Sequence, residues 1–192
     1  KYIMPALETI DIPLGFKAPD FSLLDTVSGE TKALQSLIGQ KATVVMFICN
    51  HCPYVVHIAE QLSQLAKDYT NKGVAFIAIS SNDVKKYPAD SPEKMTLFAK
   101  EYDFSFSYLY DETQEVAKAY KAACTPDFSI FDGDLSCVYR GQLDDSRPGR
   151  NIPITGNDIR QALDAILAKK VVSSEQKPSI GCSIKWKGAA PY

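Results

Sequence analysis

The sequence predicts an α/β fold in which helices flank a central mixed sheet. Residues 42–80 hold two continuous apolar runs, typical of strands buried on both faces, with an amphipathic helical pattern between them. Such a strand, helix, strand unit indicates parallel pairing. Residues 128–141 then carry two short strand patterns around "DGD", which is a hairpin signal and adds antiparallel pairing. A final helical pattern starts near Asn157.

The strand, helix, strand unit has the clearest pattern in the chain. "ATVVMFI" (42–48) is apolar and rich in β-branched residues, and "VAFIAIS" (74–80) has a similar composition. From Pro53 the apolar residues recur at three- and four-residue steps, which predicts an amphipathic helix over 53–70. Gly73 then supplies a left-handed cap. We therefore expect the two strands to be neighbours in the sheet.

A polar stretch separates this unit from a second helix and strand. Ser91 and Pro92 are typical of the cap and first position of a helix, which we expect to reach about Tyr102. "FSYLY" (106–110) has the composition of a strand. "DETQEVAKAYK" (111–121) predicts a short helix with acidic residues in its first turn.

The remaining elements are the hairpin, the last helix and a tail. The hairpin strands are "FSIFD" (128–132) and "LSCVYRG" (135–141). The apolar positions of the last helix are Ile159, Ala162, Leu163, Ile166 and Leu167. The tail, residues 171–192, is irregular, but its apolar residues favour docking on the domain: Ile180, Cys182, Ile184 and Trp186.

Length, composition and charge indicate one globular domain without a nucleic-acid or membrane partner. The 192 residues are 45% hydrophobic, which suits a single domain over 1–192 with a core at about 15–170 and the docked tail at 171–192. A net charge of −2 gives no basic field for a phosphate backbone or an anionic membrane. The apolar runs are too short to span a bilayer. We expect a cytoplasmic protein; because the chain starts at Lys1, export after removal of a leader is the alternative.

Five cysteines, an odd number in a chain of this length, argue against a disulfide scaffold. The default interpretation of each is a small buried hydrophobic residue, and Cys137 keeps it. Cys49 and Cys52 are different, because "FICNHCPYVV" places them between a buried strand and the start of a helix.

Several motifs together resemble those of the peroxiredoxin-like, thioredoxin-fold proteins, also called redoxins. They are "GFKAPDFSLLDTVSGE", "FICNHCPYV", "CTPDFSIFD", "RGQLDDSRP" and "GCSIKWK". The resemblance implies a thioredoxin-like fold with an added N-terminal hairpin, for which residues 15–30 are the match. It also implies that Thr125–Pro126 is a cis peptide bond, with Pro126 opposite the active-site cysteine.

The resemblance bears on which cysteine is the nucleophile. A simple C-x-x-C interpretation of "CNHC" makes Cys49 attack first. In thioredoxins, however, the first cysteine stands at the helix start, and counting back from Tyr69 puts Cys52 there. Val55 then occupies the position of the second cysteine. The chain therefore departs from the dithiol pattern, and we predict Cys52 as the nucleophile.

The helix start at Pro53 supports the assignment of Cys52 as the nucleophile. Pro53 suits the first helical position, which puts Cys52 at the N-cap, facing the free amides of Tyr54 and Val55 and the positive end of the helix dipole. At such sites cysteine pKa values fall to about 3.5–7.5. His51 adds a proton acceptor or a positive charge, with a solvated loop side chain as the alternative.

These residues predict a thiol–disulfide oxidoreductase. A mixed disulfide on Cys52 needs a second thiol to release it, and the order of expectation is Cys49, Cys124 and Cys182. We expect a protein or small-molecule disulfide as substrate and a thioredoxin- or glutathione-type reductant. Neither a cofactor nor a resident metal is expected.

Peroxide reduction is the main alternative within the same fold. Around their attacking cysteine, peroxiredoxins carry a pattern similar to P-x-x-x-T-x-x-C. In this chain Val55 occupies the position of that cysteine. If Cys52 is tested against the pattern instead, Cys49 stands in place of threonine and Val45 in place of proline. The hydroxyl that would orient peroxide is missing in either register.

Two further alternatives lie outside redox enzymology. Soft ligands suited to copper(I) or zinc are offered by Cys49, His51, Cys52 and Cys124, although a second C-x-x-C is missing. The other alternative is a thioredoxin-fold binding module without turnover.

Overall fold

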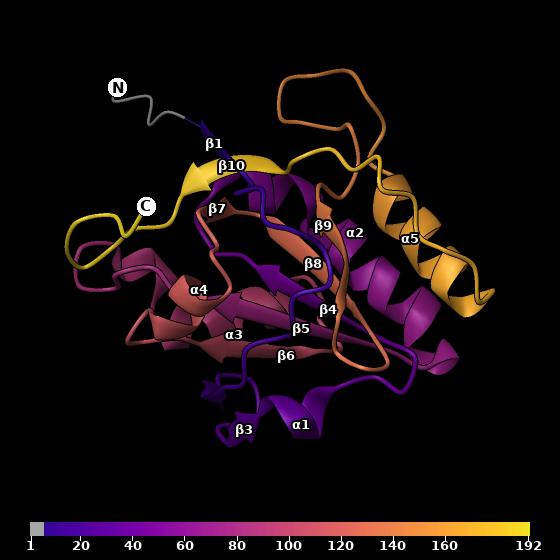
Figure 1. Cartoon of the computed structure of the whole chain (residues 1–192). Helices are drawn as coiled ribbons and strands as arrows, with labels where there is room; N and C mark the ends of the chain where they lie inside the picture. The colour runs from indigo at the N-terminus through magenta and orange to yellow at the C-terminus, as the bar shows by residue number, and fades with distance from the viewer. Residues whose placement is uncertain (1–5) are drawn as a thin grey trace.

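The computed structural model describes residues 6–192, shown in Figure 1. In chain order the elements are β1 (Ala6–Glu8), β2 (Ser22–Asp25), β3 (Thr31–Ala33), α1 (Leu34–Leu37), β4 (Ala42–Phe47), α2 (Pro53–Tyr69), η1 (Thr70–Lys72), β5 (Val74–Ser80), η2 (Pro88–Asp90), α3 (Pro92–Glu101), β6 (Ser107–Tyr110), α4 (Glu115–Ala119), β7 (Cys124–Thr125), β8 (Asp127–Asp132), β9 (Cys137–Gly141), α5 (Asn157–Leu167) and β10 (Ile180–Ser183).

A seven-stranded mixed sheet forms the centre, in the order β3-β2-β6-β5-β4-β8-β9. β4 pairs in parallel with β5 on one side and antiparallel with β8 on the other. All residues of β4 are buried, as its continuous apolar sequence predicts. The buried apolar residues of α2, α3 and α5 belong to one core cluster, and those of α1 and α4 belong to a second. β2 and β3 form the expected N-terminal hairpin.

α2 begins directly after the loop that leaves β4. Pro53 is its first residue, and Cys52 is the N-cap, with extended backbone angles of φ −72° and ψ 122°. The buried face of the helix follows the three- and four-residue spacing of the sequence. This buried face holds the helix against the sheet, and the helix start in turn fixes the position of Cys52.

The C-terminal tail docks through β10. In Figure 1, β10 lies between β1 and β7, and these three strands form a second, small sheet. Cys182 pairs with Ala6 on one side and with Thr125 on the other. The tail therefore reaches the loop that precedes Pro126.

One helix is shorter than the sequence predicts. α4 starts at Glu115, not at the beginning of the expected range 111–121. The reason is local: Gln114 has a left-handed backbone with φ 67°, and the carboxylate of Asp111 accepts a hydrogen bond from the amide of Ala117 at 2.9 Å. These two features make a turn that caps the helix. Among the described residues, no helix is both long enough and apolar enough to cross a lipid bilayer.

Candidate active site

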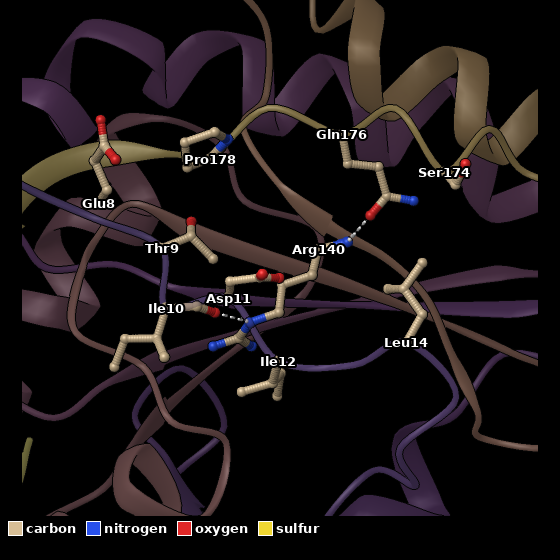
Figure 2. A pocket seen from close by; sticks show the side chains of 10 residues that line it. All are labelled: Glu8, Thr9, Ile10, Asp11, Ile12, Leu14, Arg140, Ser174, Gln176 and Pro178. Atoms are coloured by element: carbon tan, nitrogen blue, oxygen red, sulfur yellow. Dashed lines mark hydrogen bonds between the residues drawn. The ribbon is translucent and has the colours of Figure 1, made fainter.

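A cavity of about 460 Å³ lies beside the N-terminal segment, and Figure 2 shows its lining residues, none of which is a cysteine. Its lining residues are Glu8, Thr9, Ile10, Asp11, Ile12, Leu14, Arg140, Ser174, Gln176 and Pro178. The guanidinium of Arg140 donates to the carbonyl of Ile10 at 2.9 Å and to Ser129 Oγ at 3.1 Å. A third guanidinium nitrogen donates to the carbonyl of Lys121, so protein oxygens hold Arg140 in place, and the lining contains no thiol.

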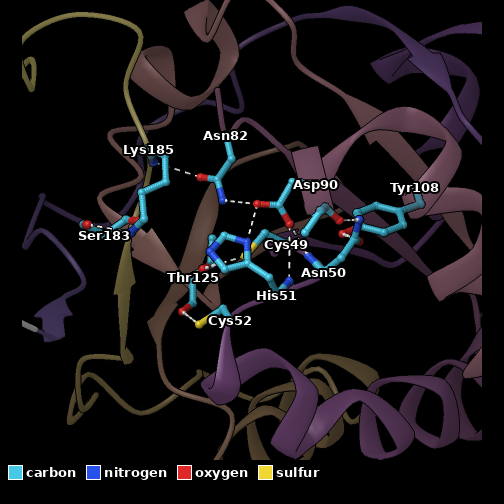
Figure 3. Close-up of polar contacts among 11 residues, drawn as sticks. Cys49, Asn50, His51, Cys52, Asn82, Asp90, Tyr108, Thr125, Ser183 and Lys185 are labelled. Carbon is cyan, nitrogen blue, oxygen red and sulfur yellow. Dashed lines mark hydrogen bonds and ion pairs between the residues drawn. The ribbon is translucent and has the colours of Figure 1, made fainter. Parts of the chain in front are cut away.

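Cys52 faces the loop that carries Pro126. The side chain of Cys52 is fully buried, and its Sγ lies 3.2 Å from the carbonyl oxygen of Thr125. The Thr125–Pro126 peptide bond is cis, in agreement with the expectation from the sequence. Figure 3 shows the contact between Cys52 at the start of α2 and Thr125. The fold thus brings two of the predicted site residues, Cys52 and Pro126, to the same place.

Three cysteines share one set of contacts. Hydrogen bonds from the thiol of Cys182 and then from that of Cys49 hold the pKa of Cys52 well below its usual range, against the opposing effect of burial. The pKa values of Cys49 and Cys182 are raised, in each case chiefly by this hydrogen bond. The contact with the Thr125 carbonyl opposes ionisation, because only a protonated sulfur can donate to it. On balance, the arrangement favours a thiolate on Cys52 and protonated thiols on Cys49 and Cys182.

The helix start contributes less than the sequence analysis expects. Cys52 makes no side-chain cap hydrogen bond in the described structure, although the amide of Val55 adds to the lowering of its pKa. The amide of Cys182 has a larger effect than that of Val55. The reason is that β10 pairs with β7 and brings Cys182 next to Thr125, whose carbonyl lies 3.2 Å from the Cys52 sulfur.

Cys49 and Cys124 lie in different surroundings. Cys49 is 1% exposed, and its Sγ is 3.5 Å from Thr125 Oγ1. The thiol of Cys124 is directed to the carbonyl of Pro126, 3.7 Å away, and burial raises its pKa. Cys137 donates to the carbonyl of Tyr139 at 3.3 Å and packs in the second core cluster, as a structural thiol should. Cys49 therefore belongs to the thiol cluster, while Cys124 contacts its own loop.

His51 is held by a buried carboxylate. Its Nδ1 lies 2.5 Å from Asp90 Oδ2, and its ring stacks on Tyr87 with centroids 5.7 Å apart. The hydrogen bond with Asp90 raises the pKa of His51, although burial acts in the opposite direction. His51 is therefore an ordered side chain whose protonated form is favoured by Asp90, and not a freely solvated one.

Asp90 connects this histidine to the tail. Burial disfavours its charged form, but hydrogen bonds from His51 and Asn82 outweigh burial and hold its pKa below the usual value. Asn82 donates to Asp90 Oδ2 at 2.8 Å and accepts from the amide of Lys185 at 2.9 Å. Asn50 N donates to Asp90 Oδ1 at 2.8 Å. Figure 3 shows this chain of contacts from the loop before α2 to the segment after β10.

Sequence reasoning did not find Asp90, Asn82 or Lys185. A signal existed for Asn82, because it follows β5, the parallel neighbour of β4, and loops after parallel neighbours meet at one sheet edge. Asp90 comes from η2, and Lys185 from the tail, so their positions depend on contacts between distant parts of the chain.

A metal site would use a different set of residues from the one expected. Single ligand atoms of Cys49, His51 and Asp90 lie within 4.8 Å of one another. This group keeps Cys49 and His51 but replaces Cys52 and Cys124 by a hard carboxylate, which suits copper(I) poorly. Both oxygens of Asp90 already accept hydrogen bonds from the protein. The geometry favours an ordered hydrogen-bond network at this place.

Comparisons with known proteins agree with the fold. A crystal structure of an uncharacterized conserved protein from Geobacillus kaustophilus is 60% identical over 97% of this chain and 99% of that one, with a TM-score of 0.95. A hypothetical protein from Sinorhizobium meliloti 1021 is 45% identical over 95% and 99% of the two chains, with a TM-score of 0.92. No curated protein matches the chain.

A more distant likeness and a family match identify the class. The thioredoxin domain of a thiol-disulfide oxidoreductase from Bacteroides vulgatus is 17% identical over 70% of this chain and 92% of that one, with a TM-score of 0.60. At this identity the likeness concerns the fold alone, and it confirms the predicted thioredoxin-like fold. The model of the AhpC/TSA family matches residues 14–140, which is more than half of the sequence. The chain therefore belongs to the AhpC/TSA family.

Proposed function

We propose that the protein is a thiol–disulfide oxidoreductase in which Cys52 is the nucleophile. The observation that carries this proposal is the position of Cys52 at the N-cap of α2, with its sulfur 3.2 Å from the carbonyl of Thr125, directly before the cis-Pro126. The neighbouring thiols of Cys182 and Cys49 lower the pKa of Cys52. Two protonated donors favour the thiolate, which is the attacking form of cysteine. Thr125 and Pro126, which face this sulfur, are the proposed positioning groups for the disulfide.

The reaction follows from thiol–disulfide exchange. The Cys52 thiolate bonds one sulfur of a protein or small-molecule disulfide, and the other sulfur leaves with the electron pair. His51, as an ordered cation paired with Asp90, supplies positive charge and a proton near the departing thiolate. A second cysteine then displaces the bound product. A thioredoxin- or glutathione-type reductant finally returns two electrons and two protons to the resulting intramolecular disulfide.

Two of the three expected resolving thiols act on the pKa of Cys52. Cys49, first in the order expected from the sequence, and Cys182 both lower that pKa, whereas the thiol of Cys124 is directed to the carbonyl of Pro126. Cys124 is therefore the weakest of the three candidates.

The test is selective alkylation. The reduced protein is treated briefly with limiting iodoacetamide near pH 6, and the labelled cysteine is mapped by peptide mass spectrometry. We expect Cys52 to carry the label and Cys52→Ser to lose disulfide reductase activity. Cys137→Ser, a change in the second core cluster, is the matched control and should react like the wild type. First labelling of Cys49, or activity in Cys52→Ser, would show that the nucleophile is assigned wrongly.

Peroxide reduction is a second candidate, favoured by the match to the AhpC/TSA family. In that reaction the Cys52 thiolate attacks one peroxide oxygen, the O–O bond breaks, and the other oxygen takes up a proton and leaves as water or an alcohol. The resulting sulfenic acid later condenses with a thiol to form a disulfide and release water. The hydroxyl of Thr125 contacts Cys49 instead of Cys52, so it is not placed to orient peroxide on the proposed nucleophile. Comparing kcat/KM for hydrogen peroxide and for a disulfide, with Cys52→Ser as the blank, separates the two activities.

A further inference from the structure

We propose that Cys182, carried on β10, is the thiol that resolves the mixed disulfide on Cys52. This inference rests on the proposed function, because it takes Cys52 as the nucleophile. It replaces the order expected from the sequence, in which Cys49 comes first. It also gives the C-terminal tail a chemical role.

The register of β10 places Cys182 on the nucleophile. Cys182 pairs with Thr125, whose carbonyl lies 3.2 Å from Cys52 Sγ. Gly181 permits this close approach, because a Cβ at that position would lie 1.9 Å from the Thr125 carbonyl oxygen. The thiol and the amide of Cys182 both lower the pKa of Cys52. Strand pairing therefore places Cys182 beside Cys52 before any disulfide forms.

Access to Cys52 requires the cover of the site to open. The side chain of Cys52 is fully buried, so no disulfide can reach its sulfur in the closed structure. β10 contributes to that cover. It pairs with β7 only through Cys182 with Thr125 and Ser183 with Cys124, and its other edge pairs with the three residues of β1. Short pairing of this kind opens more easily than the long central strands. β10, the strand that opens in this scheme, thus carries the thiol of Cys182.

Closure brings the thiol back to the same place. On one side of β10, Ser179 Oγ donates to the carbonyl of Pro126 at 2.6 Å. On the other, the amide of Lys185 donates to Asn82 Oδ1 at 2.9 Å. These contacts fix the register in which β10 returns. When β10 closes on a mixed disulfide, Cys182 meets the Cys52 sulfur. β10 also competes with the bound product for pairing with the backbone of Thr125 in β7.

Cys49 has a different role in this scheme. It is 1% exposed and lies just beyond β4, which is paired on both sides, whereas Cys182 is partly exposed. Cys49 can donate a hydrogen bond to the thiolate without moving. We assign it to stabilising the thiolate, and Cys182 to the second exchange step.

The second exchange step transfers the Cys52 sulfur from the bound product to Cys182. The Cys182 thiol gives up its proton as its sulfur bonds Cys52 Sγ, and the bond between Cys52 and the product breaks with its electron pair on the product sulfur. The product thiolate takes up a proton. The substrate disulfide has then been reduced to two thiols, and Cys52 with Cys182 has been oxidised to one disulfide. An external dithiol of the thioredoxin type reduces this disulfide by the same exchange.

The test counts leaving groups in a single turnover. Reduced full-length protein is mixed with one molar equivalent of dithiobis-nitrobenzoate, a chromogenic disulfide that releases one coloured thiolate on attack and a second on resolution. The wild type should release both and yield a Cys52–Cys182 disulfide on peptide mapping. Cys182→Ser should release one and keep a nitrobenzoate adduct on Cys52. Cys49→Ser should still release both, and Cys137→Ser serves as the control.

The outcomes separate the two proposals. If Cys52→Ser reacts like the wild type, the proposed function fails. If Cys52→Ser is silent but the wild type yields a Cys49–Cys52 disulfide, and Cys49→Ser keeps the adduct, the nucleophile stands and the role of Cys182 is overturned. Mapping the wild-type disulfide needs no variant, so the test holds even if Cys182→Ser folds poorly.

Discussion

Replacing Cys182 by alanine should raise the pKa of Cys52. The substitution removes the thiol whose hydrogen bond is the largest single cause of the lowered Cys52 pKa. It leaves the Cys49 thiol and the amides of Val55 and residue 182 in place. The remaining donors should keep the pKa of Cys52 below its ordinary value, although less far below it.

The size of the change follows from the strength of one hydrogen bond to a charged group. Such a bond contributes about 1.5–3 kcal/mol, and about 1.4 kcal/mol corresponds to a tenfold change in the acid dissociation constant. The midpoint of thiolate formation should therefore rise by about 1 to 2 pH units. Alanine also removes part of the cover over a fully buried sulfur, so absolute reaction rates can increase while the midpoint rises.

The assay is the pH dependence of alkylation at Cys52, mapped by peptide mass spectrometry. The pH series starts at about pH 2, because the pKa of Cys52 is lowered to about 2. Normalised rates give the midpoint independently of access. Cys137→Ala is the control, because Cys137 donates to Tyr139 on its own strand and does not contact the site. An unchanged midpoint in Cys182→Ala would refute the claim that the tail stabilises the thiolate.

Three further predictions concern the tail, the histidine and a buried carboxyl group. Gly181→Ala should dislodge β10, because the added Cβ would collide with the carbonyl oxygen of Thr125. Faster amide hydrogen exchange in β10 would show this, and unchanged protection of those amides would contradict it. Asp90→Asn should lower the pKa of His51, followed by NMR titration of the ring. In the wild type the raised pKa makes this ion pair fully stabilising below about pH 6.5, with the contribution lost as pH rises through the folded-state value. Burial raises the pKa of Asp127 to about 6, so stability should fall as pH rises from about 4 to 6; denaturant unfolding should show a flatter profile in Asp127→Asn, and equal profiles would exclude the effect.

The sequence was most informative where the controlling contacts are local. The apolar run of β4, the period of α2 and the preset φ of Pro53 together place Cys52 at an N-cap, and the structure has it there. α5 begins at Asn157 and ends at Leu167, as its apolar spacing predicts. These elements follow from short-range pattern and from burial on a helix or sheet face.

The sequence was less informative about the neighbours of the nucleophile. Proximity along the chain placed Cys49 first and Cys182 last among the expected partners, but strand pairing decides which thiols meet. Cys182 reaches Cys52 because β10 adds to β7, a pairing between residues far apart in sequence. Asp90 likewise contacts His51 from a separate loop. Periodicity carries no information about such long-range register.

The docking of the tail and the state of His51 depend on a common side chain. Asn82 uses its amide nitrogen to donate to Asp90 and its carbonyl oxygen to accept from the backbone of Lys185. When the segment after β10 leaves, the carbonyl of this buried amide loses its partner, and an unsatisfied buried acceptor costs about 1–3 kcal/mol. The amide can recover a partner by turning, but it then weakens its bond to Asp90, which holds His51. If the tail opens as proposed, Cys52 becomes exposed and the ion pair beside it is loosened. Substrate entry and the charge near the Cys52 sulfur would then be coupled through Asn82.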